Sequence, residues 1–587
     1  MIVVIIVNLS TGLCVLCEDY ASGPVRLTVV SFFSFVISYP NTFARKTIGF
    51  LVFKSFGQSV MSVDATSRAT RKSLQPEVGL HSDATTTSAG EHPHLANQPY
   101  EENSAAPGEE ALYTEEVRES SAVEFQLSDR LTLSERVRIP SGGQIALSPP
   151  YKCSAQVTLL DGECEMFGAN LTPGKVYEFI YPQRSVMASF AGCQVFVRKS
   201  GYIEPTTVIL GDPYPDMVGW IHAVLEEQRL RAEASQQYLR GPAIMVTGPM
   251  DSAKSSTCRT LLQYAIAAGW HPTFVDLDAG QQGISLPGMF SMAIMDSSTE
   301  AHPERGAMTQ RYVLPLGKIN MNDDTLLCRQ QGECLAKEVQ RSLDKARHLE
   351  SSGVIINTAG WIDRHGFISL TEFAEIFHVN LILVMDDAHL GHRFKKWIAE
   401  TEQDIEILYC HKPVSLALRT IEARRDYRDH VVKSAFCLPD GSPTQWTIVP
   451  LNKLIFYQIA SFHNVELRNG KKIAVCNQVS GPSTNLSRVL AISSATTLEC
   501  DVKSFRVLGF AVLLRFSTPA NQAWIVSTMD LNRVRGQVIL LRTEVMAGGI
   551  RHLYPKEELF AEPVPTTRTP AKPFRYPVNQ VHHGGGY

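Results

Sequence analysis

The sequence predicts a three-part α/β protein, with a central parallel sheet flanked by an N-terminal β-sandwich and a C-terminal β-rich domain. Apolar runs alternate with helical patterns over residues 241–435, which is typical of a parallel sheet covered on both faces. Short alternating runs separated by turn residues occupy 122–202, and β-like segments return over 436–555. Each part is justified below in chain order.

Size and composition set the first limits. The chain has 587 residues, of which 44% are hydrophobic and 19% charged, enough for several domains with substantial cores. The formal net charge of −4 excludes a global basic field, so any RNA contact must come from a local patch. The 12 cysteines show no zinc-type spacing, and we interpret them as reduced thiols of an intracellular protein.

Residues 1–121 are predicted to be a disordered or mispredicted N-terminal extension. The apolar start, Met1 to Val7, lacks a basic region, so a signal peptide or anchor is less favoured than a mispredicted gene start with Met61 as the initiator. Residues 61–121 are rich in Ser, Thr, Ala, Glu and Pro without periodicity, which indicates disorder. Because the remaining chain has no apolar run of about 20 residues, no membrane partner is expected, and the tail 556–587 is predicted to be flexible.

The N-terminal β-sandwich is predicted over 122–202 and is followed by a connecting helix over 203–240. The sandwich strands are short alternating runs such as 144–148 and 193–197, separated by turns containing glycine. The helix is indicated by apolar residues at helical spacing, and the Gly241-Pro242 pair should end it. These apolar residues are Met217, Trp220, Ile221, Val224 and Leu225.

Five near-continuous apolar runs predict the strands of the central sheet. In an open parallel sheet, ligands bind beyond the carboxyl ends of the strands. Polar residues that follow these runs are therefore candidates for a functional site. The runs are Ala243–Thr247, Thr273–Leu277, Val354–Thr358, Leu381–Met385 and Ile405–Tyr409.

The loop Gly248-Pro-Met-Asp-Ser-Ala-Lys-Ser255 lies between the first of these strands and a helical pattern. Strand, tight loop, lysine, hydroxyl and helix is the plan of a nucleoside-triphosphate phosphate cradle, which makes the central sheet one of the P-loop NTPase type. Lys254 would reach the β- and γ-phosphates and Ser255 would bind magnesium. Ala253 stands where a glycine is expected, and its Cβ costs about 1–2 kcal/mol if that position is left-handed.

Two further strand ends carry residues suited to chemistry. Asp278 follows the second strand and could bind magnesium or accept a proton from an attacking hydroxyl, the alternative being a turn or helix-capping aspartate. Trp361 follows the third strand and could stack on a base, the alternative being a packed core tryptophan. Asp386 and Asp387 follow the fourth strand, and we favour a helix-capping role over a metal site.

A run of arginines follows the last strand, comprising Arg419, Arg424, Arg425 and Arg428. A solvated helix face is the plain interpretation of such a run. Beside a phosphate loop, a lid whose arginines stabilise a transferring phosphoryl group is favoured instead.

Taken together, these segments resemble one family: the polynucleotide 5′-hydroxyl kinase subunit of the eukaryotic pre-mRNA 3′-end cleavage factor, whose animal members also act in tRNA splicing. The carriers of the resemblance are the loop 248–256, the segment Pro272–Gln281 with 285–288, Val354–Trp361 and the arginine series. The resemblance covers about residues 122–550 and implies ATP and Mg²⁺ as ligands, with the N-terminal domain closing over the adenine.

The resemblance also assigns roles to residues. It implies catalytic roles for Asp278, Lys254, Arg419 and Arg424, and magnesium binding by Ser255 and Asp278. It implies RNA-substrate contacts for Trp361, Gln281 and Arg425. The nucleotide would be bound by Gly248, Asp251, Ser252, Ala253, Lys254, Ser255 and Ser256, and by Arg184 at the adenine. The acidic partner at the adenine falls near Thr132, where this chain has no carboxylate.

Two departures from the family pattern bear on turnover. One is Ala253, and the other is the turn Lys318–Asp324, which resembles fungal members that bind ATP without turning it over. The resemblance therefore implies a nuclear, ATP-binding subunit of the cleavage and polyadenylation machinery that binds other cleavage-factor subunits. Whether it is an RNA 5′-hydroxyl kinase or a catalytically silent ATP-bound scaffold stays open, and the two departures predict weak or absent kinase activity. The ribosomal-RNA-processing branch of the superfamily is disfavoured by the sandwich that precedes the loop and by the Trp361 segment.

Overall fold

A computed structural model describes residues 2–8, 13–19, 26–31, 124–127, 131–235, 239–296, 308–416, 419–438, 441–466, 472–479, 481–495, 505–534 and 536–554. The chain divides into two compact units, 1–108 and 109–587. In the first unit, β1 (Ile2–Asn8), β2 (Leu13–Asp19) and β3 (Arg26–Ser31) form an antiparallel three-stranded sheet, where we predict an unstructured extension. Their β-branched residues favour strands. The rest of 1–121 and the tail 556–587 lie outside the described residues.

The second unit begins with the predicted β-sandwich, which consists of two five-stranded sheets in the orders β10-β7-β12-β5-β4 and β13-β6-β11-β8-β9. Alternate residues along the longer strands are buried and meet in one core that includes Ile139, Val157 and Val195. The strands are β4 (Glu124–Leu127), β5 (Leu131–Ile139), β6 (Gly143–Leu147), β7 (Ser154–Gly162), β8 (Glu165–Met166), β9 (Ala169–Asn170), β10 (Val176–Ile180), β11 (Ser185–Ser189), β12 (Cys193–Ser200) and β13 (Val208–Ile209).

The connecting helix α1 (Tyr214–Ala234) ends before the predicted Gly241-Pro242 stop. Its buried face contains Val218, Ile221 and Leu225. The prediction that Trp220 packs on this face is wrong, because its side chain is 56% exposed. Val218, which was not among the apolar residues singled out from the sequence, is buried instead.

The central sheet contains the five predicted parallel strands, in the order β15-β18-β14-β19-β20. Two antiparallel strands, β16 and β17, extend it beyond β15 and were not predicted, so the sheet is mixed rather than purely parallel. The seven strands are β14 (Ala243–Thr247), β15 (Thr273–Asp276), β16 (Met289–Met295), β17 (Met308–Pro315), β18 (Val354–Asn357), β19 (Leu381–Met385) and β20 (Glu406–Cys410).

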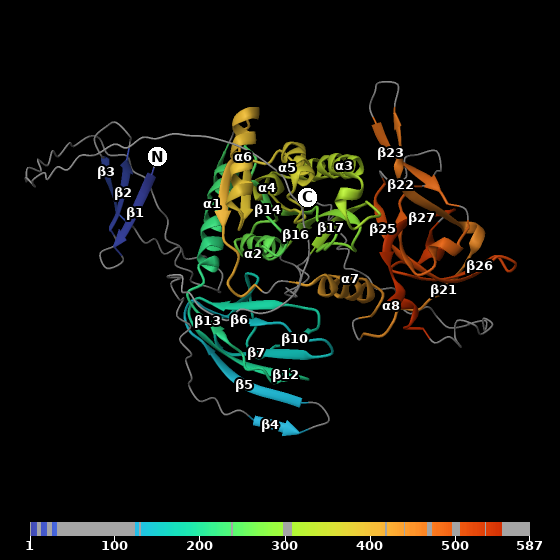
Figure 1. Ribbon diagram of the computed structural model, residues 1–587, viewed down its shortest axis with the longest axis horizontal. Coiled ribbons are helices and arrows are strands. Elements are labelled where there is room, and N and C mark those ends of the chain that lie inside the picture. Colours follow the sequence, from blue (N-terminus) through green and yellow to red (C-terminus); the bar gives the residue numbers. More distant parts are fainter. Residues whose placement is uncertain are drawn as a thin grey trace, which may run out of the picture. The chain divides into compact units, whose positions relative to one another are not determined.

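Helices cover both faces of this sheet (Figure 1). One core packs α1 and α2 against one face, where Ile244 and Val246 of β14 point. The other core packs α3, α5 and α6 against the opposite face, where Met245 points. This alternation along β14 explains why its sequence is continuously apolar. The helices are α2 (Lys254–Ala267), α3 (Thr325–Leu343), α4 (Arg347–Ser352), α5 (Arg364–Ile376) and α6 (Ala388–Thr401).

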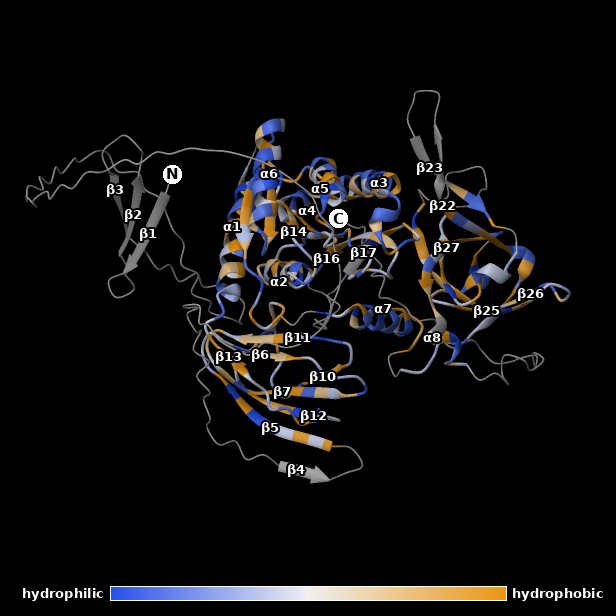
Figure 2. Ribbon diagram, viewed as in Figure 1, coloured by the Kyte–Doolittle hydropathy of each residue, from blue (hydrophilic) through white to orange (hydrophobic). Residues whose placement is uncertain are grey.

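The helix α7 (Ile421–Ala435) leads from the central sheet into the C-terminal region, and Figure 2 shows it as hydrophilic over most of its length. A seven-stranded sheet follows in the order β21-β26-β25-β24-β27-β22-β23. Within the described ranges, no helix is both long and apolar enough to cross a membrane. The last elements are β21 (Thr447–Pro450), β22 (Leu454–Glu466), β23 (Lys472–Gln478), β24 (Arg488–Ser493), β25 (Val507–Ser517), β26 (Gln522–Ser527), β27 (Val538–Met546) and α8 (Gly548–Arg551).

Candidate functional site

The loop between β14 and α2 has the backbone geometry of a tight cradle. A Cβ at Gly248 would lie 2.5 Å from the Met385 carbonyl oxygen, so only glycine fits there. Asp251 and Ala253 both have positive φ values, 56° and 67°. The backbone is therefore left-handed at two positions before α2 begins at Lys254, and α2 receives no side-chain cap from its N-cap residue, Ala253. Its first N–H groups point toward the cradle, where an anion would be favoured.

Lys254 is buried within this loop. Its Nζ donates a hydrogen bond to the Pro249 carbonyl oxygen at 2.5 Å, and Ser252 Oγ donates to the same oxygen at 2.9 Å. Burial lowers the pKa of Lys254 to about 8, an effect opposed by the negative charges of Asp278 and Asp251. The lysine is thus held inside the cradle, with Asp278 close enough to influence its protonation.

A polar chain that the sequence reasoning missed links the loop to the neighbouring strands. Asn357, the last residue of β18, donates its Nδ2 hydrogen to Asp276 Oδ1 at 3.0 Å. Its Oδ1 accepts a hydrogen bond from Ser255 Oγ at 3.4 Å. Asp276 also accepts from the Gly283 N–H at 2.7 Å, and burial together with Asp278 raises its pKa to about 7. The signal that could have found this chain was Asn357 itself, a polar residue that ends an apolar strand.

Asp278 lies at the exit of β15, as predicted. Its Oδ1 accepts hydrogen bonds from the backbone N–H groups of Gly280 and Gln281, at 2.9 and 3.1 Å. It is therefore a turn aspartate, the alternative role considered for it, and it also lies within electrostatic reach of Lys254 and Arg428. Burial raises the pKa of Asp278, while Lys254 and the two N–H donors oppose that rise.

Trp361 follows β18 at the same edge of the sheet. Its loop packs tightly on the phosphate loop, since a Cβ at Gly360 would lie 2.7 Å from the Met250 backbone nitrogen. The Trp361 side chain is half-buried against the core beneath α5, close to Asp363, which caps α5 through the Gly366 N–H at 2.9 Å. Trp361 is therefore partly packed in the core, as one interpretation expects, and it also lies beside the candidate site, as the base-stacking interpretation requires.

Of the two aspartates after β19, Asp387 has the predicted helix-capping role and Asp386 does not. Asp387 caps α6 by accepting the Leu390 N–H at 2.8 Å, and Asp386 forms an ion pair with Lys412 at 2.6 Å. Neither contact belongs to the phosphate loop.

The arginine series contacts the phosphate loop through Asp251. Asp251 Oδ2 accepts hydrogen bonds from Arg424 Nη2 at 2.6 Å and from the Arg419 N–H at 3.1 Å. Arg419 Nη1 also donates to Gln281 Oε1 at 3.0 Å. Arg425 is exposed. Arg428 lies near enough to Asp278 for the two charges to interact.

Two more basic side chains converge on Arg419. The positive charges of Arg184, from the sandwich, and Arg259, from α2, add to burial in lowering the pKa of Arg419. Arg259 was not singled out from the sequence, and its guanidinium lies 5.6 Å from the Phe167 ring centroid. Thr132, in contrast, lies on β5 in the sheet opposite to β11, the strand that Arg184 precedes.

The turn Lys318–Asp324 lies next to the loop that follows β15. It contains a short 3₁₀ turn, Met321–Asp323, and Asp324 caps α3 through the Leu327 N–H at 3.0 Å. A Cβ at Gly280 would lie 3.3 Å from the Ile319 carbonyl oxygen. This turn therefore packs directly on the loop that carries Asp278.

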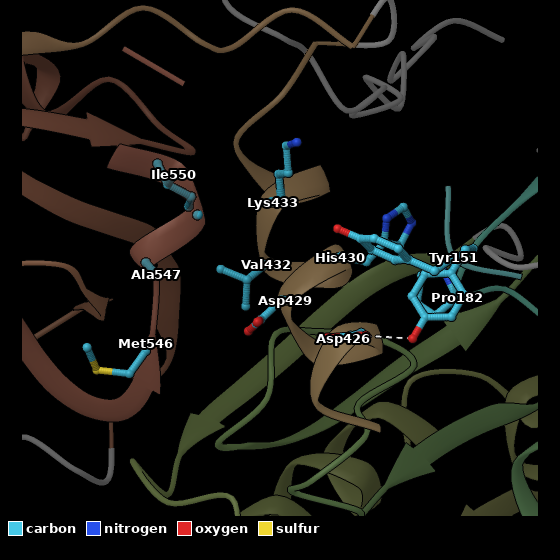
Figure 3. A pocket seen from close by; sticks show the side chains of 12 residues that line it. Tyr151, Pro182, Asp426, Asp429, His430, Val432, Lys433, Met546, Ala547 and Ile550 are labelled. Carbon is cyan, nitrogen blue, oxygen red and sulfur yellow. Dashed lines mark hydrogen bonds between the residues drawn. The ribbon is translucent and has the colours of Figure 1, made fainter. Parts of the chain in front are cut away.

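A cavity of about 320 Å³ lies beside the C-terminal half of α7 (Figure 3). Residues from the sandwich, α7 and the C-terminal region line it, including Tyr151, His430 and Met546. Within it, Tyr181 Oη donates a hydrogen bond to Asp426 Oδ2 at 2.5 Å. This contact ties the sandwich to α7.

The residues at the sheet edge fit a nucleotide bound with magnesium. The uncapped start of α2, the left-handed loop positions and Lys254 suit phosphate oxygens. In the part of the chain that the structure describes, no group of three or more His, Cys, Asp or Glu side chains could hold a metal. Mg²⁺ in phosphate loops needs few protein ligands because the substrate phosphates and water supply the rest, so Ser255 with Asn357 and Asp276 behind it is compatible with such a site.

Comparison with known proteins supports this interpretation of the loop. A family model described as "mRNA cleavage and polyadenylation factor CLP1 P-loop" matches residues 248–437, and one described as "N-terminal beta-sandwich domain of polyadenylation factor" matches 139–232. Protein CLP1 homolog of Drosophila sechellia is 31% identical over 369 residues, covering 60% of this chain and 84% of the relative. The chain belongs to the CLP1 family. The predicted family membership is thus confirmed.

Other CLP1 relatives match over different lengths. The Drosophila grimshawi homologue is 31% identical over 388 residues, covering 63% of this chain and 87% of the relative. The match to the Aedes aegypti homologue, 30% identical over 280 residues, spans 48% of this chain and 64% of that protein. The solved wild-type Clp1p–Pcf11p complex aligns with a TM-score of 0.60 at 17% identity, covering 70% of this chain and 98% of the other. This CLP1 structure confirms the predicted fold of sandwich, central P-loop sheet and C-terminal β-rich region.

Proposed function

We propose that this CLP1 family member is an ATP-binding subunit of the nuclear mRNA 3′-end cleavage and polyadenylation machinery that transfers the γ-phosphoryl group of ATP to the 5′-hydroxyl of RNA. The observation that carries this proposal is the convergence of Lys254, Asp278 and the arginine segment on one sheet edge. A phosphate-binding lysine, a carboxylate and fixed positive charge are the protein groups that phosphoryl transfer requires.

Each residue has a distinct role in this proposal. The loop from Gly248 to Ser256 binds the triphosphate, with Lys254 as its positive charge, and Ser255 binds Mg²⁺, which neutralises charge on the phosphates. Asp278 accepts the proton of the RNA hydroxyl at Oδ2, because backbone N–H groups already bind Oδ1. Arg419 and Arg424 stabilise charge on the transferred group, while Arg184 binds the adenine and Trp361 with Gln281 and Arg425 binds the RNA end.

The raised pKa of Asp278 suits this role. A carboxylate that is too acidic is a poor proton acceptor, and burial in this loop moves its pKa upward from the ordinary range. The positive charge of Lys254 opposes the rise. Each of the two groups therefore favours the charged form of the other.

The partners proposed for the chain are other cleavage-factor subunits. A solved CLP1 relative was obtained as a complex of Clp1p with Pcf11p, and a second solved structure, at 18% identity, concerns their extended interface and ATP loss in a point mutant. We extend both properties, binding of a Pcf11-type subunit and of ATP, to this chain.

The test is transfer of radiolabel from γ-labelled ATP to an RNA oligonucleotide with a 5′-hydroxyl, with Mg²⁺ varied. The proposal expects label on the RNA with wild-type protein, and loss of label with Asp278→Asn and with Lys254→Met. Asp530→Asn, which removes a carboxylate of the C-terminal region, is the control for general damage. Absence of transfer by wild type at every Mg²⁺ concentration would contradict kinase activity.

A second candidate function is a catalytically silent scaffold in which ATP joins the sandwich to the central sheet. The observation that favours it is Ala253, whose φ of 67° places an alanine in a left-handed conformation where glycine is preferred. Protein that purifies with unhydrolysed ATP, melts higher when ATP is present and transfers no label would establish the scaffold. Ala253→Gly separates the two, since a gain in transfer shows that the alanine limits turnover.

A further inference from the structure

Asp251 is an unexpected residue for a loop that binds a triphosphate. A carboxylate next to several phosphate oxygens repels them unless a cation neutralises it. Its backbone has a φ of 56°, a conformation in which aspartate is tolerated better than most residues but glycine is better still. The carboxylate therefore needs a reason to occupy this position.

The contacts of Asp251 supply that reason. Its Oδ2 accepts hydrogen bonds from Arg424 Nη2 at 2.6 Å and from the Arg419 N–H at 3.1 Å. The Arg424 and Asp251 side chains are only 19% and 13% exposed, so water screens this pair less than an ordinary surface ion pair. One carboxylate of the phosphate loop thus binds the arginine segment at two points.

The helix α7, which carries Arg424 and follows Arg419, has little apolar burial to fix its N-terminal half. Val432 is the one buried residue along α7, all of whose residues the structure describes, and Ile421 at its start is 76% exposed. The N-terminal end of α7, where Arg424 lies, is therefore held by polar contacts. Asp251 provides the contacts that join this end to the phosphate loop.

We propose that Asp251 is a positioning residue whose carboxylate orients Arg424 and the Arg419 segment over the phosphate loop. This inference rests on the proposed function for its kinetic consequence. It departs from the role in nucleotide binding that the family resemblance implies for Asp251, because its side chain faces the arginines. Asp251 acts through Arg424 and Arg419, which touch the transferred group.

The proposal predicts that a change at Asp251 lowers kcat without raising the KM for ATP. Asp251→Asn keeps the size of the side chain but removes its charge, so Arg424 loses its orientation and kcat should fall about 10-fold. The KM for ATP should stay the same or decrease, because a negative charge near the triphosphate has been removed. A residue that binds the nucleotide itself would raise KM instead.

A double-mutant cycle isolates the contact. Arg424→Gln should lower kcat by about 10-fold or more, and adding Asp251→Asn to it should lower kcat no further, because both changes break the same interaction. Asp530→Asn is the matched control, since Asp530 also pairs with an arginine, Arg533, at 3.2 Å and lies in the C-terminal region. It should leave both kinetic constants unchanged.

If the wild-type protein transfers no phosphate, the positioning role can still be tested by hydrogen exchange of the backbone amides of residues 419–435. ATP binding is measured in a separate experiment. Asp251→Asn should then speed exchange in this segment about 5-fold while ATP still binds, whereas Asp530→Asn should not. Unchanged exchange in Asp251→Asn, unchanged kcat, additive effects in the cycle or a raised KM would each overturn the positioning role. Wild-type protein that binds no ATP would instead contradict the proposed function, and exchange would still report on the contact.

Discussion

The helices α2 and α7 border the same site but are held by different forces. α2 buries a full face, including Cys258, Leu261 and Ala265, in the core beside β14. Of its described residues, α7 fully buries Val432 alone, near its C-terminal end, and its N-terminal half forms polar contacts, namely Arg424 with Asp251 and Tyr181 with Asp426. The phosphate loop is thus held in place by apolar packing in the core, whereas the arginine segment is held in place by a few hydrogen bonds.

This difference suits the two tasks that we propose for these elements, a phosphate cradle at the start of α2 and a lid at α7. A phosphate cradle must present its N–H groups in a fixed geometry, which apolar packing maintains. A lid must close and open around substrate, so contacts of about 1 kcal/mol each are strong enough to order it and weak enough to release it. The predictions that follow test each side of this comparison, in order of decreasing effect.

The stability of the phosphate loop should be sensitive to a single added methyl group. Gly248→Ala places a Cβ 2.5 Å from the Met385 carbonyl oxygen, which is backbone and cannot move easily. We expect the free energy of unfolding to fall by about 2–3 kcal/mol, measured by urea denaturation. Gly174→Ala, at a turn with a φ of 74° but no atom within 4 Å of the added Cβ, controls for a positive φ without a close contact. Equal losses in both variants would show that the loop is not tightly packed.

The same loop should gain stability from glycine at position 253. Ala253→Gly relieves a left-handed alanine, and we expect the free energy of unfolding to rise by about 1 kcal/mol. Ala268→Gly, at a right-handed position with φ of −82° at the end of α2, should lower it by about 0.5–1 kcal/mol. Thermal melts of both variants give the comparison, and a loss of stability in Ala253→Gly would contradict the strain.

Loss of one polar contact of α7 should increase the local motion of this helix. Tyr181→Phe removes the hydroxyl that donates to Asp426, a contact expected to contribute about 1 kcal/mol. Hydrogen exchange along α7 should therefore become about 5-fold faster, with little change in the melting of the whole protein. Tyr177→Phe removes a hydroxyl that accepts the Thr172 N–H within the sandwich, and it should leave α7 unchanged. Equal exchange in α7 for both variants would mean that the sandwich does not hold this helix.

The smallest expected effect is the change in the protonation of Lys254 with pH and with ATP binding. Because burial lowers the pKa of Lys254 to about 8, the folded protein holds fewer protons than the unfolded chain between about pH 8 and 10.5, so this group's contribution to stability rises with pH there. Phosphate charge should raise the pKa again, and ATP binding should take up about 0.1 proton at pH 7 and about 0.9 at pH 9. Calorimetry in buffers of different ionisation enthalpy measures this uptake, and an uptake that does not rise with pH would contradict the lowered pKa.

The sequence predicted the loop side better than the lid side. The strand β14, the loop and Lys254 are specified locally, because an apolar run, a glycine and a lysine at fixed spacing have few alternatives. Asp387 as a helix cap was predicted for the same reason. Local pattern could not predict the antiparallel strands β16 and β17, whose pairing with β15 depends on contacts between distant segments.

The polar contacts of the site were also beyond the sequence. Asp251 with Arg424 joins residues 173 positions apart, and Asn357 with Asp276 joins residues 81 apart. The arginine run was identified, but its partner was not, because no periodicity connects a loop carboxylate with a later helix. The Trp220 side chain shows the opposite failure, where an apolar residue spaced three positions from Met217 lies on the exposed side of α1.

The central claim is that the cradle around Lys254 binds ATP with magnesium, and titration calorimetry tests it most directly. We expect wild-type protein to bind one ATP in the presence of Mg²⁺, and Lys254→Met to weaken this affinity at least about 100-fold while the protein remains folded. Wild type that releases no heat with ATP and Mg²⁺ at several temperatures, or a Lys254→Met variant that binds ATP as tightly as wild type, would contradict the account.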